Sequence, residues 1–244
     1  MRRGVLLAAL AAIAAPAAGG QRQSFETLEV RQLVTVRWGS GVPFGARPAM
    51  DMLVDVYRQT PAVVRMRGFQ QAHSTDPFDL VMMTSYRGFE GFEQARKQMV
   101  GQRTNAGGTF FTAQRHFDEA SEWHRDEFLE MLPNHDHKSG SDPRVFVFEW
   151  VRLVPAAHRA YELLLQTAVV PWERERTFLY LTETGRVLVG DGWDYVRILG
   201  FETLSGYQDY LDLWRDRSEA EQLALHVSAR KVAILREDES FRIR

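Results

Sequence analysis

Two side chains near the middle of the chain, those of Glu149 and His158, are of types that can transfer a proton. Glu149 lies within the apolar segment VFVFEWVRL, residues Val145–Leu153, where burial would raise the pKa of a carboxyl group that has no partner. A raised pKa suits a general acid or base, and a histidine such as His158 can act as a base near neutral pH. The alternatives are a glutamate that faces solvent or pairs with Arg152, and a surface histidine near a helix start.

Three further residues around these two could bind a ligand. Trp150 follows Glu149 directly, and Trp172 lies at the far end of a predicted helix that begins near His158. Indole rings could line an apolar cavity, and Arg152 could bind an anionic group. Tryptophans in the core and an arginine at the end of a strand would explain the same pattern without a ligand.

Several other chemistries lack their usual sequence markers. The 244 residues include no cysteine, which excludes disulfides, thiolate catalysis and cysteine-ligated metals. The sequence contains no P-loop, no G-x-S-x-G and no H-E-x-x-H motif. His135 and His137 flank an aspartate, but a metal site needs further rigidly held ligands, so we expect none. The net charge of −2, without a basic cluster, argues against nucleic acid as a partner.

The chain repeats a pattern of residues at a constant spacing. The segments DPFDLVMMTSYRGFEGF, residues Asp76–Phe92, and DGWDYVRILGFETLSGY, residues Asp191–Tyr207, are 115 positions apart (191 − 76 = 115). Corresponding aspartates, Asp79 and Asp194, are expected to cap turns. Seven positions of the two segments carry identical or similar residues at this offset, and so do pairs outside them, such as Val36 and Val151. Because separate parts of the chain keep one register, they indicate a duplicated structural unit.

Each copy is expected to fold as strand, helix, strand, strand, helix, strand. The first copy, residues 28–132, has predicted strands at 28–38, 63–72, 78–86 and 123–132 and predicted helices at 48–58 and 89–100. The second copy, residues 144–244, has predicted strands at 145–153, 177–181, 193–201 and 231–236 and predicted helices at 155–170 and 204–226. The last strand is expected to end at 236 or at Ile243, and the last helix to be continuous or broken near Arg217. Pro171 is expected to stop or kink the first of these helices. Residues 133–143, PNHDHKSGSDP, have the composition of a linker.

This order of elements is the ferredoxin-like β-α-β-β-α-β motif, an antiparallel sheet with helices on one face. The first strand of the second copy is apolar on both faces, with Phe146, Phe148 and Trp150 on one side. A strand of this kind needs cover on both faces, and the other copy can provide it. We therefore predict an α+β fold in which two ferredoxin-like repeats pack as a single-chain, pseudo-dimeric α/β barrel.

The steps from strand to helix carry a family resemblance. The segments YRGFEGFEQA (Tyr86–Ala95) and FETLSGYQDYL (Phe201–Leu211) place an aromatic residue, an acidic residue and a second aromatic residue in order. In this the chain resembles the dimeric α/β-barrel superfamily in tandem form, and its layout is similar to that of exported NIPSNAP-type proteins. The resemblance implies a pocket between the sheet and the first helix of a unit. Because the superfamily includes oxygenases and haem binders, it also implies that His158 could be an axial haem ligand, although the residues themselves predict no cofactor.

Residues 1–20, MRRGVLLAALAAIAAPAAGG, are typical of a signal peptide. Arg2 and Arg3 precede a short apolar run, and Ala15 and Ala17 are the small residues that a cleavage site requires. The run is shorter than a membrane-spanning helix needs. We expect export to the periplasm or the exterior, by the Sec or the twin-arginine route, and no membrane span in the mature chain.

The two copies differ in ways that favour a site in the second. Glu149 and Trp150 correspond to Val34 and Thr35 of the first copy. We therefore expect an exported protein that binds a small apolar or aromatic ligand in the second repeat. One alternative is a cofactor-independent or haem-dependent monooxygenase-like enzyme that uses Glu149 or His158. The other is a structural or assembly protein with no pocket; either a monomer or a homodimer is compatible with the sequence.

Overall fold

The first half of the chain folds as a four-stranded antiparallel sheet with helices on one face. The computed structural model describes residues 29–243 apart from 41–45, 75, 105–106 and 140–141, so the predicted signal peptide, residues 1–20, lies outside the described residues. The elements of this first unit are β1 (Glu29–Trp38), α1 (Ala46–Arg58), β2 (Val63–Ser74), β3 (Leu80–Arg87), α2 (Gly88–Val100), α3 (Phe110–Ala120) and β4 (Ser121–Met131).

The second half repeats this arrangement with more helical segments. Its elements are β6 (Val145–Leu153), α4 (His158–Leu164), a π-helical turn η1 (Leu165–Val169), α5 (Val170–Arg174), β7 (Leu179–Val189), β8 (Tyr195–Phe201), α6 (Leu204–Arg215), α7 (Ser218–His226) and β9 (Val227–Ile243). We call these elements the second unit. The predicted break of the last helix near Arg217 separates α6 from α7.

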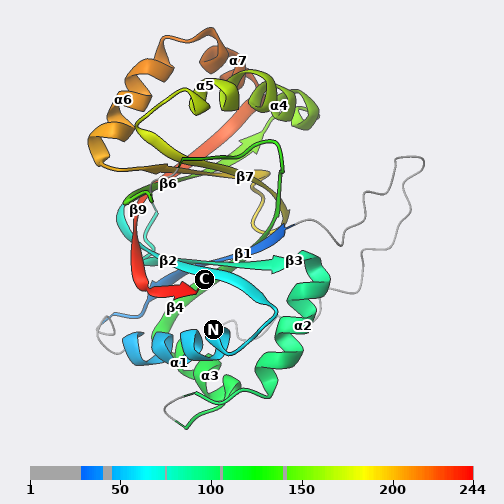
Figure 1. Ribbon diagram of the computed structural model, residues 1–244, viewed down its shortest axis with the longest axis vertical. Helices are drawn as coiled ribbons and strands as arrows, with labels where there is room; N and C mark the ends of the chain where they lie inside the picture. The colour runs from blue at the N-terminus through cyan, green and yellow to red at the C-terminus, as the bar shows by residue number, and fades with distance from the viewer. Residues whose placement is uncertain (1–28, 41–45, 75, 105–106, 140–141, 244) are drawn as a thin grey trace, which may run out of the picture.

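The two sheets join along both edges and form a closed barrel. The strand order is β4-β1-β3-β2-β9-β6-β8-β7-β5, with β5 (His137–Lys138) at the end, and β4 also pairs with β7. Figure 1 shows the barrel at the centre, α1 to α3 below it and α4 to α7 above it. The predicted fold class, a ferredoxin-like α+β barrel of two repeats, is confirmed.

The structure differs from the predicted elements in four main places. Helix α3, residues Phe110–Ala120, has no counterpart among the predicted elements. The predicted linker contains β5, which pairs with β7. The last strand begins at Val227 rather than at 231, and it reaches Ile243, the longer of its two predicted ends, where its second part pairs with β2 of the other unit. The predicted helix at 155–170 continues past Pro171, which lies in the first turn of α5, two residues after the π-helical turn η1.

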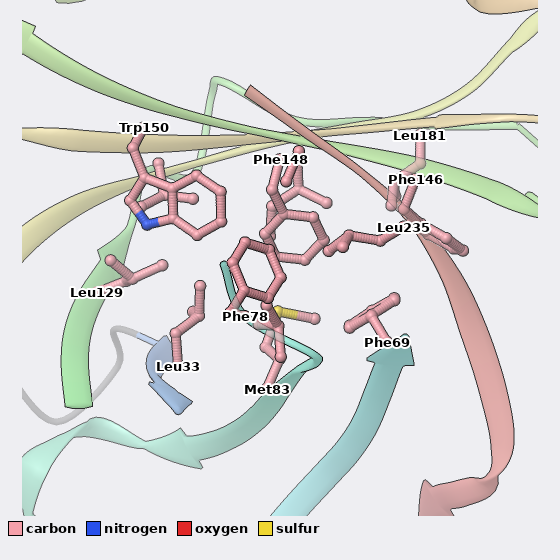
Figure 2. Packing of buried hydrophobic residues seen from close by; sticks show 14 residues of the cluster. Leu33, Phe69, Phe78, Met83, Leu129, Phe146, Phe148, Trp150, Leu181 and Leu235 are labelled. Atoms are coloured by element: carbon pink, nitrogen blue, oxygen red, sulfur yellow. The ribbon is translucent and has the colours of Figure 1, made fainter. Parts of the chain in front are cut away.

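Aromatic and aliphatic side chains from both units fill the barrel interior (Figure 2). Phe146, Phe148 and Trp150 of β6 point into it and are fully buried, as the sequence predicts for one face of this strand. The ring of Phe69 from the first unit lies 5.0 Å from that of Phe146 and 5.1 Å from that of Phe148. Each sheet therefore covers the inner face of the other.

The repeated aspartates hold equivalent backbone positions in the two units. The carboxylate of Asp79 accepts a hydrogen bond of 2.8 Å from the backbone N–H of Trp38, at the end of β1. The carboxylate of Asp194 accepts one of 2.7 Å from Leu153, at the end of β6. Leu153 follows Trp38 by the same 115 positions (153 − 38 = 115), so the repeat here serves the fold rather than a reaction.

We expect Phe148→Ala to lower the free energy of unfolding by about 3–5 kcal/mol, because it removes a fully buried ring from the barrel interior and leaves a cavity. Phe111→Ala is the matched control, since Phe111 is 60% exposed. Urea denaturation followed by circular dichroism measures both. Equal destabilisation by the two substitutions would contradict the assignment of the barrel interior as the main core.

Candidate functional site

A cavity of about 190 Å³ lies between the sheet and the helices of the second unit. It is on the outer face of the barrel, beneath α4, α6 and α7. Its floor comes from β6, β8 and β9 and its roof from the three helices. The lining residues are Glu149, Val151, Tyr161, Arg197, Tyr210, Trp214, Ala220, Leu223, Ala224, Val227 and Arg230.

The floor of the cavity carries three charged groups from adjacent strands. Glu149 of β6 pairs across the strands with Arg197 of β8, and both side chains are 3% exposed. One guanidinium nitrogen of Arg197 lies 3.6 Å from the Glu149 carboxylate. Arg230 of β9 donates a hydrogen bond to the other carboxylate oxygen of Glu149. Glu149 is thus held between two arginines.

A second buried carboxylate balances the charge of this group. Glu173 of α5 is fully buried and accepts a 2.6 Å hydrogen bond from Arg197. The same carboxylate oxygen accepts a 2.8 Å hydrogen bond from the hydroxyl of Tyr210. Two carboxylates and two guanidinium groups therefore form a neutral cluster, as burial of charge requires.

The arginines decide the ionisation state of Glu149. Burial alone would raise the pKa of this carboxyl, but the positive charges of Arg230 and Arg197 outweigh burial and hold the pKa below its ordinary value. Glu149 is therefore a carboxylate near neutral pH and a weak base. The sequence suggests Arg152 as a partner, whereas the structure provides Arg197 and Arg230.

The π-helical turn brings Glu173 onto the sheet. Tyr161 and Glu173 are 12 residues apart (173 − 161 = 12), a spacing that separates side chains by ~120° on a regular α-helix. The π-helical turn Leu165–Val169 inserts one residue between them and reduces this angle to ~20°. Both side chains consequently face the sheet, where Tyr161 lines the cavity and Glu173 meets Arg197.

Two polar groups of the cavity lining have unused hydrogen-bonding capacity. The hydroxyl of Tyr161 is buried, and it has no hydrogen-bond partner within the described part of the chain. The same holds for the Nε–H group of Arg197. Burial raises the pKa of Tyr161, so its hydroxyl keeps its proton. Both groups are hydrogen-bond donors of residues that line the cavity.

Of the five residues singled out from the sequence, only Glu149 lines this cavity. The His158 side chain is 53% exposed, and its Nδ1 atom lies 3.1 Å from the hydroxyl of Tyr195. Trp150 points into the barrel interior instead, where its indole N–H donates a 2.8 Å hydrogen bond to Glu127. His158 and Trp150 are thus on different sides of the sheet from one another and outside the cavity lining.

The remaining two candidates also lie outside the cavity lining. Trp172 is buried beneath α6, with its ring 5.2 Å from that of Trp214. It therefore packs against a residue of the cavity wall and does not line the cavity itself. Arg152 donates a 2.5 Å hydrogen bond to the carbonyl of Gly192, and its guanidinium lies 5.0 Å from the ring of Trp193. The structure therefore does not bring the five candidates together.

The corresponding face of the first unit is apolar. Val34 and Met82, 115 positions before Glu149 and Arg197, pack in a hydrophobic cluster beneath α1 and α3. A comparison of the repeats position by position could therefore have found Arg197 as well as Glu149. No comparable signal marks Tyr161, because the first helices of the two units differ in length and regularity.

The lining residues do not fit a haem. Haem iron is held by His, Cys, Met or Tyr side chains, and the lining contains none of the first three. Burial raises the pKa of both Tyr161 and Tyr210, which opposes formation of a phenolate ligand. Among the described residues, no group of three His, Asp or Glu side chains could hold a metal ion.

Solved structures share this architecture at low sequence identity. An "anthrone oxidase-like protein" is 12% identical, with a TM-score of 0.63 over 88% of this chain and 93% of that one. The crystal structure named "putative monooxygenase" from Lactobacillus acidophilus is 8% identical, with a TM-score of 0.60 over 86% and 94%. A chlorite dismutase from Candidatus Nitrospira defluvii is 11% identical, with a TM-score of 0.51 over 85% and 90%.

The chain has the dimeric α/β-barrel fold. At these identities the likeness establishes the fold alone, and the activities of those proteins are not transferred with it. No protein-family model and no curated protein matches the sequence. In the described residues, no helix of this dimeric α/β barrel is long and apolar enough to cross a membrane.

We expect Glu149→Gln to lower the free energy of unfolding by about 3 kcal/mol at pH 7, because it leaves the buried guanidinium of Arg197 with Glu173 alone, whereas Arg230 is 43% exposed and water can hydrate it. The folded-state pKa of Glu149 lies below the ordinary value of 4.5, so its stabilisation is complete above that pH and is lost as the pH falls through the folded-state pKa.

The difference in stability between the wild type and Glu149→Gln should therefore persist at pH 5 and shrink at pH 3.5. Urea denaturation at pH 7, 5 and 3.5 measures it. Glu175→Gln is the control, since that side chain is 74% exposed and should change stability little at any of these pH values. A difference that grows on acidification would contradict the assigned direction of the shift.

Proposed function

We propose that the second unit binds a small apolar or aromatic molecule of about one ring in the cavity beneath α4, α6 and α7. The observation that carries the proposal is the cavity itself, whose volume of about 190 Å³ is bounded largely by apolar side chains. An apolar cavity of ~150 Å³ is enough to hold benzene. Drug-sized ligands need ~300 Å³ or more, so this site suits a smaller molecule.

Aromatic rings in the wall favour an aromatic ligand. Tyr161, Tyr210 and Trp214 line the cavity, and the rings of Tyr210 and Trp214 stack with 12° between their planes. Flat side chains of this kind make extensive contact with a planar ligand and prefer offset or edge-on ring arrangements. Val151, Leu223 and Val227 complete the apolar surface.

Access to the cavity is supported by the weak packing of α7. This helix contributes Ala220, Leu223 and Ala224 to the roof, yet none of its residues is buried. Leu225 on the same helix is 75% exposed. A segment with few buried apolar contacts opens locally at low free-energy cost, so α7 can admit a ligand.

A second candidate function is cofactor-independent oxygenation in the same cavity. The names of the similar structures favour it, and a carboxylate lies beside the site. Such a reaction needs a base that removes a proton from the substrate, and Glu149 is a weak base because of its arginine partners. Binding without oxygenation is therefore the better supported function. Oxygen uptake on addition of a hydroquinone, lost in Glu149→Gln, would reverse this preference.

A purely structural role is less well supported. It would suit a protein whose layers are filled with side chains throughout, as the barrel interior is. The helical layer of the second unit instead contains a cavity with a buried ionic cluster. That arrangement suits ligand binding better than packing.

We expect isopropylbenzene to stabilise the wild type against heating, by roughly 5–10 °C at a concentration 100 times Kd. Ala224→Phe, which enlarges a lining residue on α7, should abolish this shift. Leu225→Phe is the control, because it adds a similar ring to the exposed side of the same helix and should leave the shift unchanged. Differential scanning fluorimetry of each variant with and without ligand gives the shift. Equal shifts in the wild type and Ala224→Phe would place the ligand elsewhere.

Export to the periplasm or exterior, in the manner of NIPSNAP-like exported proteins, belongs to the same proposal and rests on residues 1–20. We expect the chain expressed in a Gram-negative host to appear in the periplasm with an N-terminus close to residue 18, as measured by mass spectrometry. Leu7→Asp interrupts the apolar run and should retain the full-length chain in the cytoplasm. Cytoplasmic protein that keeps Met1 in the wild type would contradict export.

A further inference from the structure

We infer that the cavity selects neutral aromatic carbonyl compounds, such as aryl ketones, over carboxylates of the same shape. This inference deepens the proposed function and rests on it. The polar end of the cavity, formed by Tyr161, Arg197, Arg230 and Glu149, determines the selection, whereas the apolar walls determine the size of the ligand.

The first argument is the hydrogen-bonding capacity of that end. The Tyr161 hydroxyl and the Arg197 Nε–H are buried groups of the lining without hydrogen-bond partners among the residues that the structure describes. An unpaired donor in an apolar environment is unfavourable by a large part of a hydrogen bond. Both groups can donate, so a ligand that supplies an acceptor satisfies them. A carbonyl oxygen has two lone pairs and brings no donor of its own that would need a partner.

The second argument is the balance of charge. Glu149 and Glu173 already neutralise Arg197 and Arg230 through contacts that include the 2.6 Å bond from Arg197 to Glu173. The pKa of Glu149 is held below its ordinary value, so this carboxylate remains negative near neutral pH. An added carboxylate would lose its hydration in the same small volume and meet Glu149 at close range. A neutral acceptor avoids both penalties.

Three ligands of nearly equal shape separate these contributions. Acetophenone carries a carbonyl acceptor, isopropylbenzene has no polar atom, and benzoate carries a negative charge. Isothermal titration calorimetry at pH 7 with the full chain gives the three affinities. We expect benzoate to bind at least roughly tenfold more weakly than acetophenone to the wild type.

The decisive variant is Tyr161→Phe, which removes one donor and keeps the ring. It should lower the affinity for acetophenone by roughly fivefold, which is the effect of one lost hydrogen bond. It should change the affinity for isopropylbenzene by less than about twofold. Tyr180→Phe is the control, since the Tyr180 hydroxyl bonds to Glu202 at the surface and should affect none of the ligands.

The outcomes distinguish this inference from the proposed function. If Tyr161→Phe weakens both neutral ligands alike, or neither, or if benzoate binds as tightly as acetophenone, the carbonyl selectivity is wrong while the cavity remains a ligand site. If isopropylbenzene and acetophenone both fail to bind the wild type, or bind Ala224→Phe equally well, the proposed function itself is wrong, and the selectivity falls with it.

Discussion

Closure of the two sheets into one barrel is the constraint on which the rest of the structure depends. The pairing of β2 with β9 and of β4 with β7 closes the eight longer strands of the described chain into a ring and turns one face of each inward. The seam between β4 and β7 is tight: a Cβ atom on Gly185 would lie 2.9 Å from the Cβ of Leu129. Aromatic and aliphatic residues fill the interior, and the cavity beneath α4, α6 and α7 lies on the outer face of the second unit.

Burial of the outer face explains the ionic cluster. Helices α4 to α7 shield the outer surface of β6 and β8 from water, so an ionised residue there needs partners of opposite charge. Glu149 has arginine partners on the neighbouring strands, and Arg197 has a second carboxylate partner in Glu173 of α5. The π-helical turn places Glu173 at the correct angle, so an irregularity in the helix completes a cluster that begins with a cross-strand pair.

The fold was accessible from the sequence because it depends on patterns that repeat. The offset of 115 residues, the alternation along β6 and the order of elements all report on backbone architecture. The same alternation could have improved the prediction of the site residues. Glu149 and Trp150 are consecutive on a strand and therefore point to opposite faces, so they cannot line one cavity side by side. The positions of Tyr161 and Glu173 in the site could not be predicted from the sequence, since no residue pattern indicates the inserted residue of a π-helical turn.

The contrast between the units bears on why the cluster exists. The first unit has Val34 and Met82 at the positions of Glu149 and Arg197, and its outer face packs as an ordinary hydrophobic layer. A buried ion pair is seldom more stabilising than apolar residues of similar volume, and replacing one by the other is often neutral or favourable. Stability alone therefore does not account for charges in the second unit, since the same fold packs without them in the first. Under the proposed function the charges form a polar cavity wall, because recognition of a ligand requires groups that are directional and desolvated. On this proposal the charged positions that distinguish the repeats serve recognition, while the shared positions, such as Asp79 and Asp194, serve the barrel.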